Sequence, residues 1–185
     1  MMVDKKTLRS VVLKRRGPLT DVTERSEKVV SALFARKVFP DASVVMVYLS
    51  YNSEVVTDGI VEECSRAGKR VCVPVVADGE HMDAVYIKSG GEFVTDRYGI
   101  REPSDKSCPA DKRDIDLCVV PGSAFDLSLS RMGYGKGYYD RFLAGSDIKK
   151  IALAFDCQIV DKVPYESTDV KMDGIITESR VIGDI

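Results

Sequence analysis

The chain has 185 residues, of which 44% are hydrophobic and 30% are charged, and its formal net charge is −2. This length supports one compact domain over residues 1–185, and the balanced charge argues against general nucleic-acid binding, which usually needs a basic face. The five cysteines form no Cys-x-x-Cys pair, which argues against a zinc site or a disulfide framework.

Two helices are predicted at the start of the chain. Asp4 is a suitable cap for a helix that runs to about Arg16, where Gly17-Pro18 ends it. A second helix is predicted over residues 22–34, which carry an apolar stripe at helical spacing. In the first helix, Leu8, Val11, Val12 and Arg15 are expected to lie near one face.

A strand–helix–strand unit is predicted next. Residues 44–49 form a continuous apolar, β-branched run, which is typical of a buried parallel strand. Residues 57–67 are predicted to be helical, and residues 70–75 form a second buried strand. Residues 77–110 give a weaker signal, and we expect a covering layer there with a short strand over 84–87.

The last third of the chain continues the alternation of strands and helices. Strands are predicted over residues 117–120, 151–155 and 174–177, and a helix begins over 138–143. The pattern predicts an α/β fold, namely a single three-layer α/β/α domain with a mainly parallel sheet and helices on both faces. Ligands bind outside the carboxyl ends of such strands, so the segment after residues 117–120 is the expected site.

That segment, residues 121–143, concentrates glycines, cations and carboxylates. Its alternating glycines let the backbone approach a ligand closely, although it matches neither a P-loop nor a dinucleotide fingerprint. Its cations can neutralise phosphate, and its carboxylates can hold a hard cation such as Mg²⁺: Arg131, Lys136 and Arg141, with Asp126 and Asp140. We interpret it as a site for a nucleotide polyphosphate and its metal; the alternative is a glycine-rich turn with solvated charges.

Four further features are weaker when considered from the residues alone. Glu54 follows the predicted strand 44–49 and could bind a heterocycle, but a solvated loop residue before a cap at Thr57 is favoured. Lys5 and Arg9 share a helical face that could reach a nucleotide, although a solvated face is favoured. Asp169 and Asp173 are candidate metal ligands, and the alternative is that they belong to a polar loop. His81, the single histidine, would have to serve any Ser-His-Asp or Cys-His mechanism, but it lies in a polar turn, where a solvated role is favoured.

Together these segments resemble the 5-formyltetrahydrofolate cyclo-ligase family, also called methenyltetrahydrofolate synthetases. The resemblance covers nearly the whole chain, and its most specific part is the stretch from Arg131 to Arg141, Arg-Met-Gly-Tyr-Gly-Lys-Gly-Tyr-Tyr-Asp-Arg. The other matching elements are Lys5 with Arg9, the run from Tyr51 to Thr57, Gly99-Ile100-Arg101-Glu102-Pro103, and Pro121-Gly122-x-Ala124-Phe125-Asp126.

The resemblance implies a reaction and a set of site residues. The reaction is the ATP- and Mg²⁺-dependent cyclisation of 5-formyltetrahydrofolate to 5,10-methenyltetrahydrofolate, with release of ADP and phosphate, through a phosphorylated formyl intermediate. Substrate binding falls to Glu54, Met82 and Tyr139, and Mg²⁺ binding to Asp140 and Asp169. Arg131 and Lys136 would be catalytic, and the implied ATP-binding residues are Lys5, Arg9, Arg131, Gly133, Tyr134, Gly135, Lys136, Gly137 and Tyr138.

Two residues depart from the family pattern. Ser130 stands where the family usually has glycine before the arginine, and Thr168 stands where many members have histidine. We expect Ser130 to stiffen its loop and Thr168 to remove a polar contact, with no phosphate or metal group lost.

Two alternative functions stay open beside the cyclo-ligase. The chain could be a non-catalytic relative that binds folate or a nucleotide, or a sugar-phosphate isomerase on the same architecture.

The sequence also predicts a cellular setting. Residues 1–6 carry no apolar signal core, and no apolar run approaches the roughly 20 residues that a membrane span needs. We therefore expect a cytoplasmic monomer that acts on small molecules, without nucleic-acid or membrane partners.

Overall fold

The computed structural model describes residues 4–88, 91–95 and 99–185, so part of the segment considered for a signal sequence lies outside it. Its main element is a seven-stranded sheet in the order β12 (Val181–Ile182), β11 (Gly174–Ile176), β9 (Lys149–Leu153), β6 (Leu117–Val120), β1 (Val44–Met46), β2 (Arg70–Val76) and β3 (Met82–Ile87). The inner strands from β11 to β2 are parallel, and the edge strands β12 and β3 are antiparallel to their neighbours.

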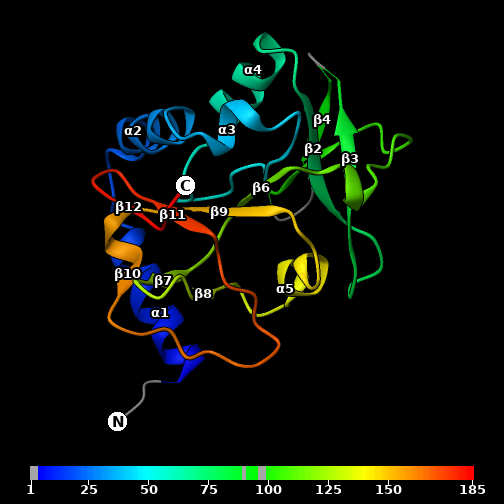
Figure 1. Ribbon diagram of the computed structural model, residues 1–185. Helices are drawn as coiled ribbons and strands as arrows, with labels where there is room; N and C mark the ends of the chain where they lie inside the picture. The colour runs from blue at the N-terminus through cyan, green and yellow to red at the C-terminus, as the bar shows by residue number, and fades with distance from the viewer. Residues whose placement is uncertain (1–3, 89–90, 96–98) are drawn as a thin grey trace.

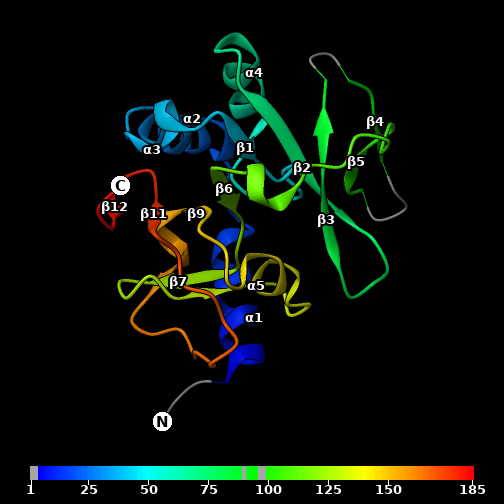
Figure 2. The same ribbon diagram turned by 45° about the vertical axis from the view of Figure 1, so that its right-hand side comes forward.

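Helices cover both faces of this sheet (Figures 1 and 2). On one face lie α2 (Val22–Phe34), α3 (Val38–Asp41) and α4 (Asp58–Arg66). On the other lie α5 (Tyr138–Leu143) and a small sheet of β10 (Ile159–Val160), β7 (Ala124–Asp126) and β8 (Arg131–Met132), against which α1 (Lys5–Arg16) packs. The predicted three-layer arrangement with a mainly parallel sheet is confirmed, and the small sheet is an addition that the sequence did not reveal.

Burial on both faces explains why the run from residue 44 onward is apolar without alternation. Val45 and Val47 belong to the core beneath α2 and α4, whereas Val44 and Met46 belong to the core beneath α5. Successive residues of a strand point to opposite faces, so both sets must be apolar. The strand is shorter than predicted and ends at Met46, although the Val47 amide still donates to the Cys72 carbonyl at 2.9 Å.

The first helix is confirmed, and of the residues predicted to share a face, Leu8 and Val12 pack against the small sheet. Asp4 caps the helix, since its carboxylate accepts from the amides of Lys6 and Thr7 at 3.0 Å. The buried residues are Val12 and Arg16, while Val11 and Arg15 are exposed. The reason is the small sheet, which packs on the face that contains Val12 and so turns Arg16, four residues later, inward as well.

The segment with the weak signal contains more strand than predicted. Besides β3 it forms a hairpin of β4 (Phe93–Thr95) and β5 (Arg101–Pro103), which lies beside β3 in Figure 2. Two short 3₁₀ turns complete the regular structure of the chain, at Lys112–Asp114 and Asp156–Gln158.

Gly122, directly after β6, has no room for a side chain. An added Cβ would lie 2.5 Å from Cζ of the fully buried Phe125. Because overpacking a rigid core costs about 1–3 kcal/mol, Gly122→Ala is expected to lower the free energy of unfolding by that amount in urea titrations. Gly59 on α4 is the matched control, since its Cβ would meet nothing within 4 Å. Gly59→Ala is expected to raise stability by about 0.5–1 kcal/mol, and equal effects at the two positions would contradict the argument.

Candidate active site

The site lies where the order of the main sheet reverses. From β1 the chain first adds β2 on one side and later adds β6 on the other side. The segments that leave the carboxyl ends of β1 and β6 therefore diverge, and a crevice opens between them. Residues 47–57 and residues 121–137 are these two segments, and both contain residues predicted to form the site.

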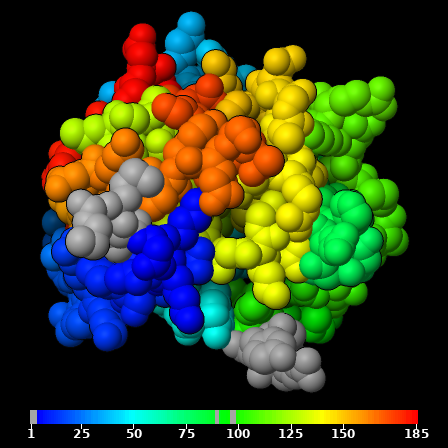
Figure 3. Space-filling view, turned by 90° about the horizontal axis from the view of Figure 1, so that it is seen from below, coloured from blue at the N-terminus to red at the C-terminus, as the bar shows by residue number. Residues whose placement is uncertain are grey.

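A cavity of about 840 Å³ adjoins the segment after β6. Figure 3 shows the blue N-terminal helix, the yellow α5 region and the orange segment near residue 165 coming together on this face. Six cations and three carboxylates line the cavity, so its charge favours an anion. All of the residues assigned to ATP and metal by the resemblance lie around it: Lys5, Arg9, Arg131, Gly133, Tyr134, Gly135, Lys136, Gly137, Tyr138, Asp140 and Asp169.

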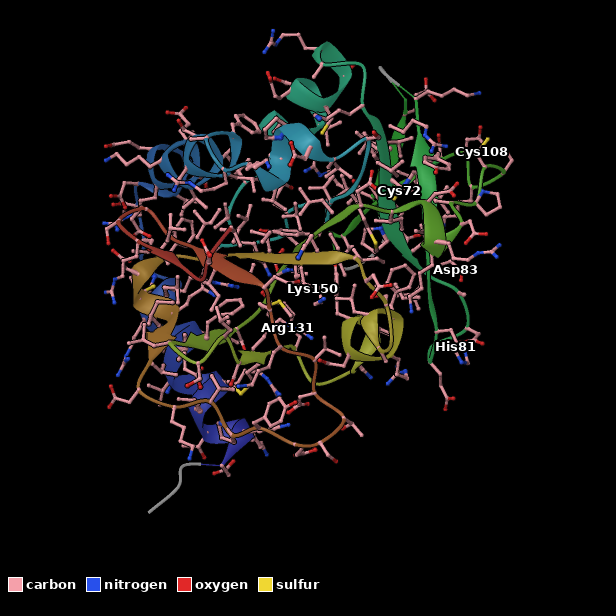
Figure 4. The ribbon with its side chains drawn as sticks, in the orientation of Figure 1. Cys72, His81, Asp83, Cys108, Arg131 and Lys150 are labelled. Atoms are coloured by element: carbon pink, nitrogen blue, oxygen red, sulfur yellow. The ribbon has the colours of Figure 1, made fainter. Side chains whose placement is uncertain are left out.

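Arg131 is fixed before any ligand binds. It lies below the main sheet in Figure 4 and is only 6% exposed. Its Nη1 donates to the Pro121 carbonyl at 3.1 Å, and its Nη2 donates to Asp140 Oδ2 at 2.8 Å. Its buried Nε has no hydrogen-bond partner among the described residues, and the guanidinium lies over the Tyr139 ring at 5.6 Å. Arg131 therefore presents a rigid cation at the cavity wall.

The first turns of α1 supply the opposite wall. Lys5 Nζ binds Asp169 Oδ2 at 2.8 Å and Glu166 Oε1 at 3.1 Å, while Arg9 Nε donates to the Gly133 carbonyl at 3.1 Å. Lys5 and Arg9 therefore face the cavity, and the fully solvated face that the residues alone favoured is wrong.

Lys136, like Lys6, lines the cavity without a side-chain partner among the described residues. It is exposed on the cavity rim, and its ammonium group makes no hydrogen bond or ion pair within the part of the chain that the structure describes. The glycines on either side adopt left-handed backbone angles, with φ of 97° at Gly135 and 68° at Gly137. A Cβ at Gly135 would also lie 3.3 Å from Arg9 Nη1, so the absence of a side chain at Gly135 lets the Arg9 guanidinium approach the backbone closely.

Glu54 is buried, which corrects the expectation of a solvated loop residue. It is 8% exposed; its Oε2 accepts from the Tyr51 amide at 3.0 Å and its Oε1 from the Tyr134 hydroxyl at 2.5 Å. Burial raises the pKa of the Glu54 carboxyl, and the bond from Tyr134 opposes that shift. Glu54 does not itself line the large cavity and meets it through Tyr134.

A second, smaller cavity of about 170 Å³ adjoins the first. Met82 and Tyr139, the other residues assigned to the substrate, both line it, together with Tyr48 and Ile100. Tyr138 and Tyr139 line both cavities, so the cationic and the aromatic spaces are neighbours.

Three candidate residues have structural roles instead. Asp126 is 3% exposed, and its carboxylate accepts from the amides of Ser128, Ser130 and Val163, so it is not available to a metal. Asp173 binds the Lys150 amide and ammonium group, away from the cavity. Thr57 precedes α4, but its hydroxyl donates to the Tyr48 carbonyl instead of capping the helix.

The residues that depart from the family pattern leave the cationic groups in place. Ser130 is buried, and the left-handed residue in its loop is its neighbour Leu129, with φ of 64°. Thr168 lies at the rim of the large cavity, and His81 lies on an exposed turn beside Asp78, apart from Arg131 in Figure 4.

The fold and the cavity together define an α/β protein with a cation-lined cavity beside the switch point of its sheet. Within the described residues, no helix combines the length and the apolar character that crossing a membrane requires.

Comparisons with known proteins identify the family. A sequence model of the 5-formyltetrahydrofolate cyclo-ligase family matches residues 1–178. The 5-formyltetrahydrofolate cyclo-ligase of Escherichia coli strain K12 is 34% identical over 151 residues, which cover 76% of this chain and 80% of that protein. A probable 5-formyltetrahydrofolate cyclo-ligase of Caenorhabditis elegans is 32% identical over 176 residues, which cover 88% of this chain and 85% of that protein.

A solved structure agrees with the sequence relatives. The NMR structure of Aquifex aeolicus 5,10-methenyltetrahydrofolate synthetase superposes with a TM-score of 0.84 at 31% identity, over 96% of this chain and 91% of that one. The chain therefore belongs to the 5-formyltetrahydrofolate cyclo-ligase family, a family of ligases, and the predicted resemblance is confirmed. This membership argues against the sugar-phosphate isomerase.

Proposed function

We propose that the chain closes the ring of 5-formyltetrahydrofolate at the expense of ATP, giving 5,10-methenyltetrahydrofolate, ADP and phosphate. The observation that carries this proposal is the contact between the two cavities through Tyr138 and Tyr139. The cationic cavity suits a triphosphate, and the aromatic cavity suits a flat ring system. A cytoplasmic location and a monomeric state, without nucleic-acid or membrane partners, belong to the same proposal and stay predictions.

The proposed chemistry proceeds in two steps. The formyl oxygen of the N5 amide attacks the γ-phosphorus of ATP, the bond to the bridging oxygen breaks, and ADP leaves. The N10 nitrogen then attacks the activated formyl carbon and loses its proton, the carbon–oxygen bond breaks, and phosphate leaves. Phosphoryl transfer of this kind needs positioning and charge neutralisation more than a nucleophilic side chain.

The residues of the large cavity fit this need. Lys136 is free to follow the transferring phosphoryl group, and Arg131 offers a fixed guanidinium. Lys5 and Arg9 would hold the remaining phosphates from the opposite wall. Glu54, whose carboxylate accepts from the Tyr134 hydroxyl, would bind the N10 region of the folate, while Met82 and Tyr139 would pack on its ring.

Asp140 and Asp169 suit a Mg²⁺ ion that arrives with the nucleotide. Asp140 Oδ1 accepts from the amide of Val170, the residue after Asp169, and both Asp140 and Asp169 line the cavity. No cluster of three or more His, Cys, Asp or Glu ligands occurs within residues 4–88, 91–95 and 99–185. Mg²⁺ usually keeps its waters and takes one or two carboxylates plus phosphate oxygens, so two suffice. When bound, the ion would neutralise charge on the phosphates.

Removing one of these carboxylates is expected to weaken the response to magnesium. In Asp169→Asn, the Mg²⁺ concentration that gives half the maximal rate at fixed ATP is expected to rise about tenfold or more, the scale set by changes around metal ligands. Asp161→Asn, an exposed change in the same segment, is the control and should leave this concentration unchanged. An equal response in the two variants would remove Asp169 from the metal site.

The proposed reaction is tested by its absorbing product. Purified protein is mixed with 5-formyltetrahydrofolate, ATP and Mg²⁺, and the near-ultraviolet band of the methenyl product is followed. Growth that needs both ATP and Mg²⁺ supports the cyclo-ligase. Absence of growth, with ATP still bound, would replace it with a folate- or nucleotide-binding relative.

A further inference from the structure

Arg16 is a buried cation without an acidic partner. It is the last residue of α1 and is 4% exposed. Across the described ranges, no carboxylate lies within ion-pair distance of its guanidinium, whereas Arg25, Arg101 and Arg131 all have one. Burying a charge is costly unless hydrogen bonds or a nearby opposite charge compensate it, so the surroundings of Arg16 must supply that compensation.

The guanidinium of Arg16 joins the two segments that form the crevice. Its Nε donates to Ser53 Oγ at 3.0 Å, in the segment after β1. Its Nη1 donates to the Tyr134 hydroxyl at 3.0 Å and to the Gly122 carbonyl at 3.4 Å, both in the segment after β6. One side chain from α1 therefore fixes the spacing between the loops that diverge at the switch point.

Tyr134 links Arg16 to Glu54 through hydrogen bonds. Its hydroxyl accepts from Arg16 and donates to Glu54 Oε1 at 2.5 Å, so the cation and the carboxylate are bridged by one oxygen. Burial and the neighbouring Glu54 charge raise the pKa of the Tyr134 phenol, which keeps its proton available for this bond. The nearest counter-charge of Arg16 is thus Glu54, reached through a residue that lines the large cavity.

We infer that Arg16 is a positioning residue that holds Tyr134 and Glu54 in place for the folate substrate. Arg16 lines neither the large cavity nor the small one, so it would act on the substrate only through Tyr134. The substrate part of this inference rests on the proposed function. The bridge itself does not, because it concerns contacts within the chain.

The kinetic test uses three variants. Arg16→Gln is expected to lower kcat/KM for 5-formyltetrahydrofolate by about 10- to 100-fold, the range typical of residues that orient a functional group, with a clearly smaller change in KM for ATP, whose cavity Tyr134 also lines. Arg16→Lys keeps the charge and should recover part of the loss. Arg15→Gln removes an exposed arginine from the same helical turn and should match the wild type. Equal losses toward folate and ATP, or no loss in folded Arg16→Gln, would overturn the inference.

A second test needs no activity. Arg16→Gln, Glu54→Gln and their double variant are unfolded in urea, in the wild-type background and in Tyr134→Phe. The bridge predicts that the double variant loses less stability than the sum of the single losses, and that this difference disappears in Tyr134→Phe. Additive losses in the wild-type background would overturn the bridge. If the wild type forms no methenyl product, the proposed function fails while this test still decides the bridge.

Discussion

Replacing Lys136 with alanine is expected to lower kcat by about 10³-fold while leaving the fold intact. Removing one group that stabilises developing charge costs about 10²–10³-fold, and Lys136 lies within the glycine segment of this cavity with no side-chain partner of its own among the described residues. Its exposed side chain contributes little to packing, so the free energy of unfolding should change by less than about 0.5 kcal/mol. Product absorbance and urea unfolding measure the two effects.

Lys37→Ala is the matched control for this prediction. The Lys37 side chain is 86% exposed and lies just before α3, on the face of the sheet opposite the cavity. Both variants lose one positive charge, so a shared loss of rate would reflect the net charge of the molecule. Full activity in Lys136→Ala would exclude its proposed role.

Arg131→Met is expected to abolish activity and to destabilise the protein by about 2–4 kcal/mol. The change removes the donors to the Pro121 carbonyl and to Asp140, whose side chain is only 18% exposed. A mostly buried carboxylate without its cation carries most of that cost. The contrast with Lys136→Ala, which is expected to lose only activity, separates a fixed cation from a free one.

A double variant identifies the origin of this destabilisation. If the unpaired carboxylate is responsible, Asp140→Leu introduced into Arg131→Met should restore part of the lost stability, because no buried charge is then left unpaired. Urea unfolding of the two single variants and the double variant measures the coupling. Strictly additive losses would show that Arg131 stabilises the fold through other contacts.

Local pattern predicts the sheet and the glycine segment well. The run that contains β1 is apolar on both faces because each face meets its own core, and that signal needs no knowledge of distant residues. Gly135 and Gly137 adopt positive φ angles, and glycine is the residue that adopts such angles most readily, so the sequence indicates this backbone conformation directly. The position of the cationic cavity then follows from one rule about the ends of parallel strands.

The parts that the sequence could not predict depend on contacts between distant residues. Nothing in the first helix distinguishes Arg16 from the exposed Arg15, because the sheet that buries Arg16 is assembled from three very short strands. In the sequence Glu54 is a polar residue of a loop, and its burial depends on Tyr134, 80 residues later, whose hydroxyl donates to it. Asp126 and Asp140 are both aspartates of the glycine segment, and the sequence does not distinguish their roles. In the fold, Asp126 accepts from backbone amides, whereas Asp140 pairs with Arg131.

The ion pair between Lys5 and Asp169 has a consequence for the order of assembly. The two residues are separated by 164 positions, so this wall of the cavity closes only after Asp169 has left the ribosome. The sheet strands β1 and β2 can pair much earlier, since they are close in sequence. The pairing of β1 with β2 can therefore precede the closing of this wall, and a ligand that spans Lys5 and Asp169 would stabilise the closed wall over its opening.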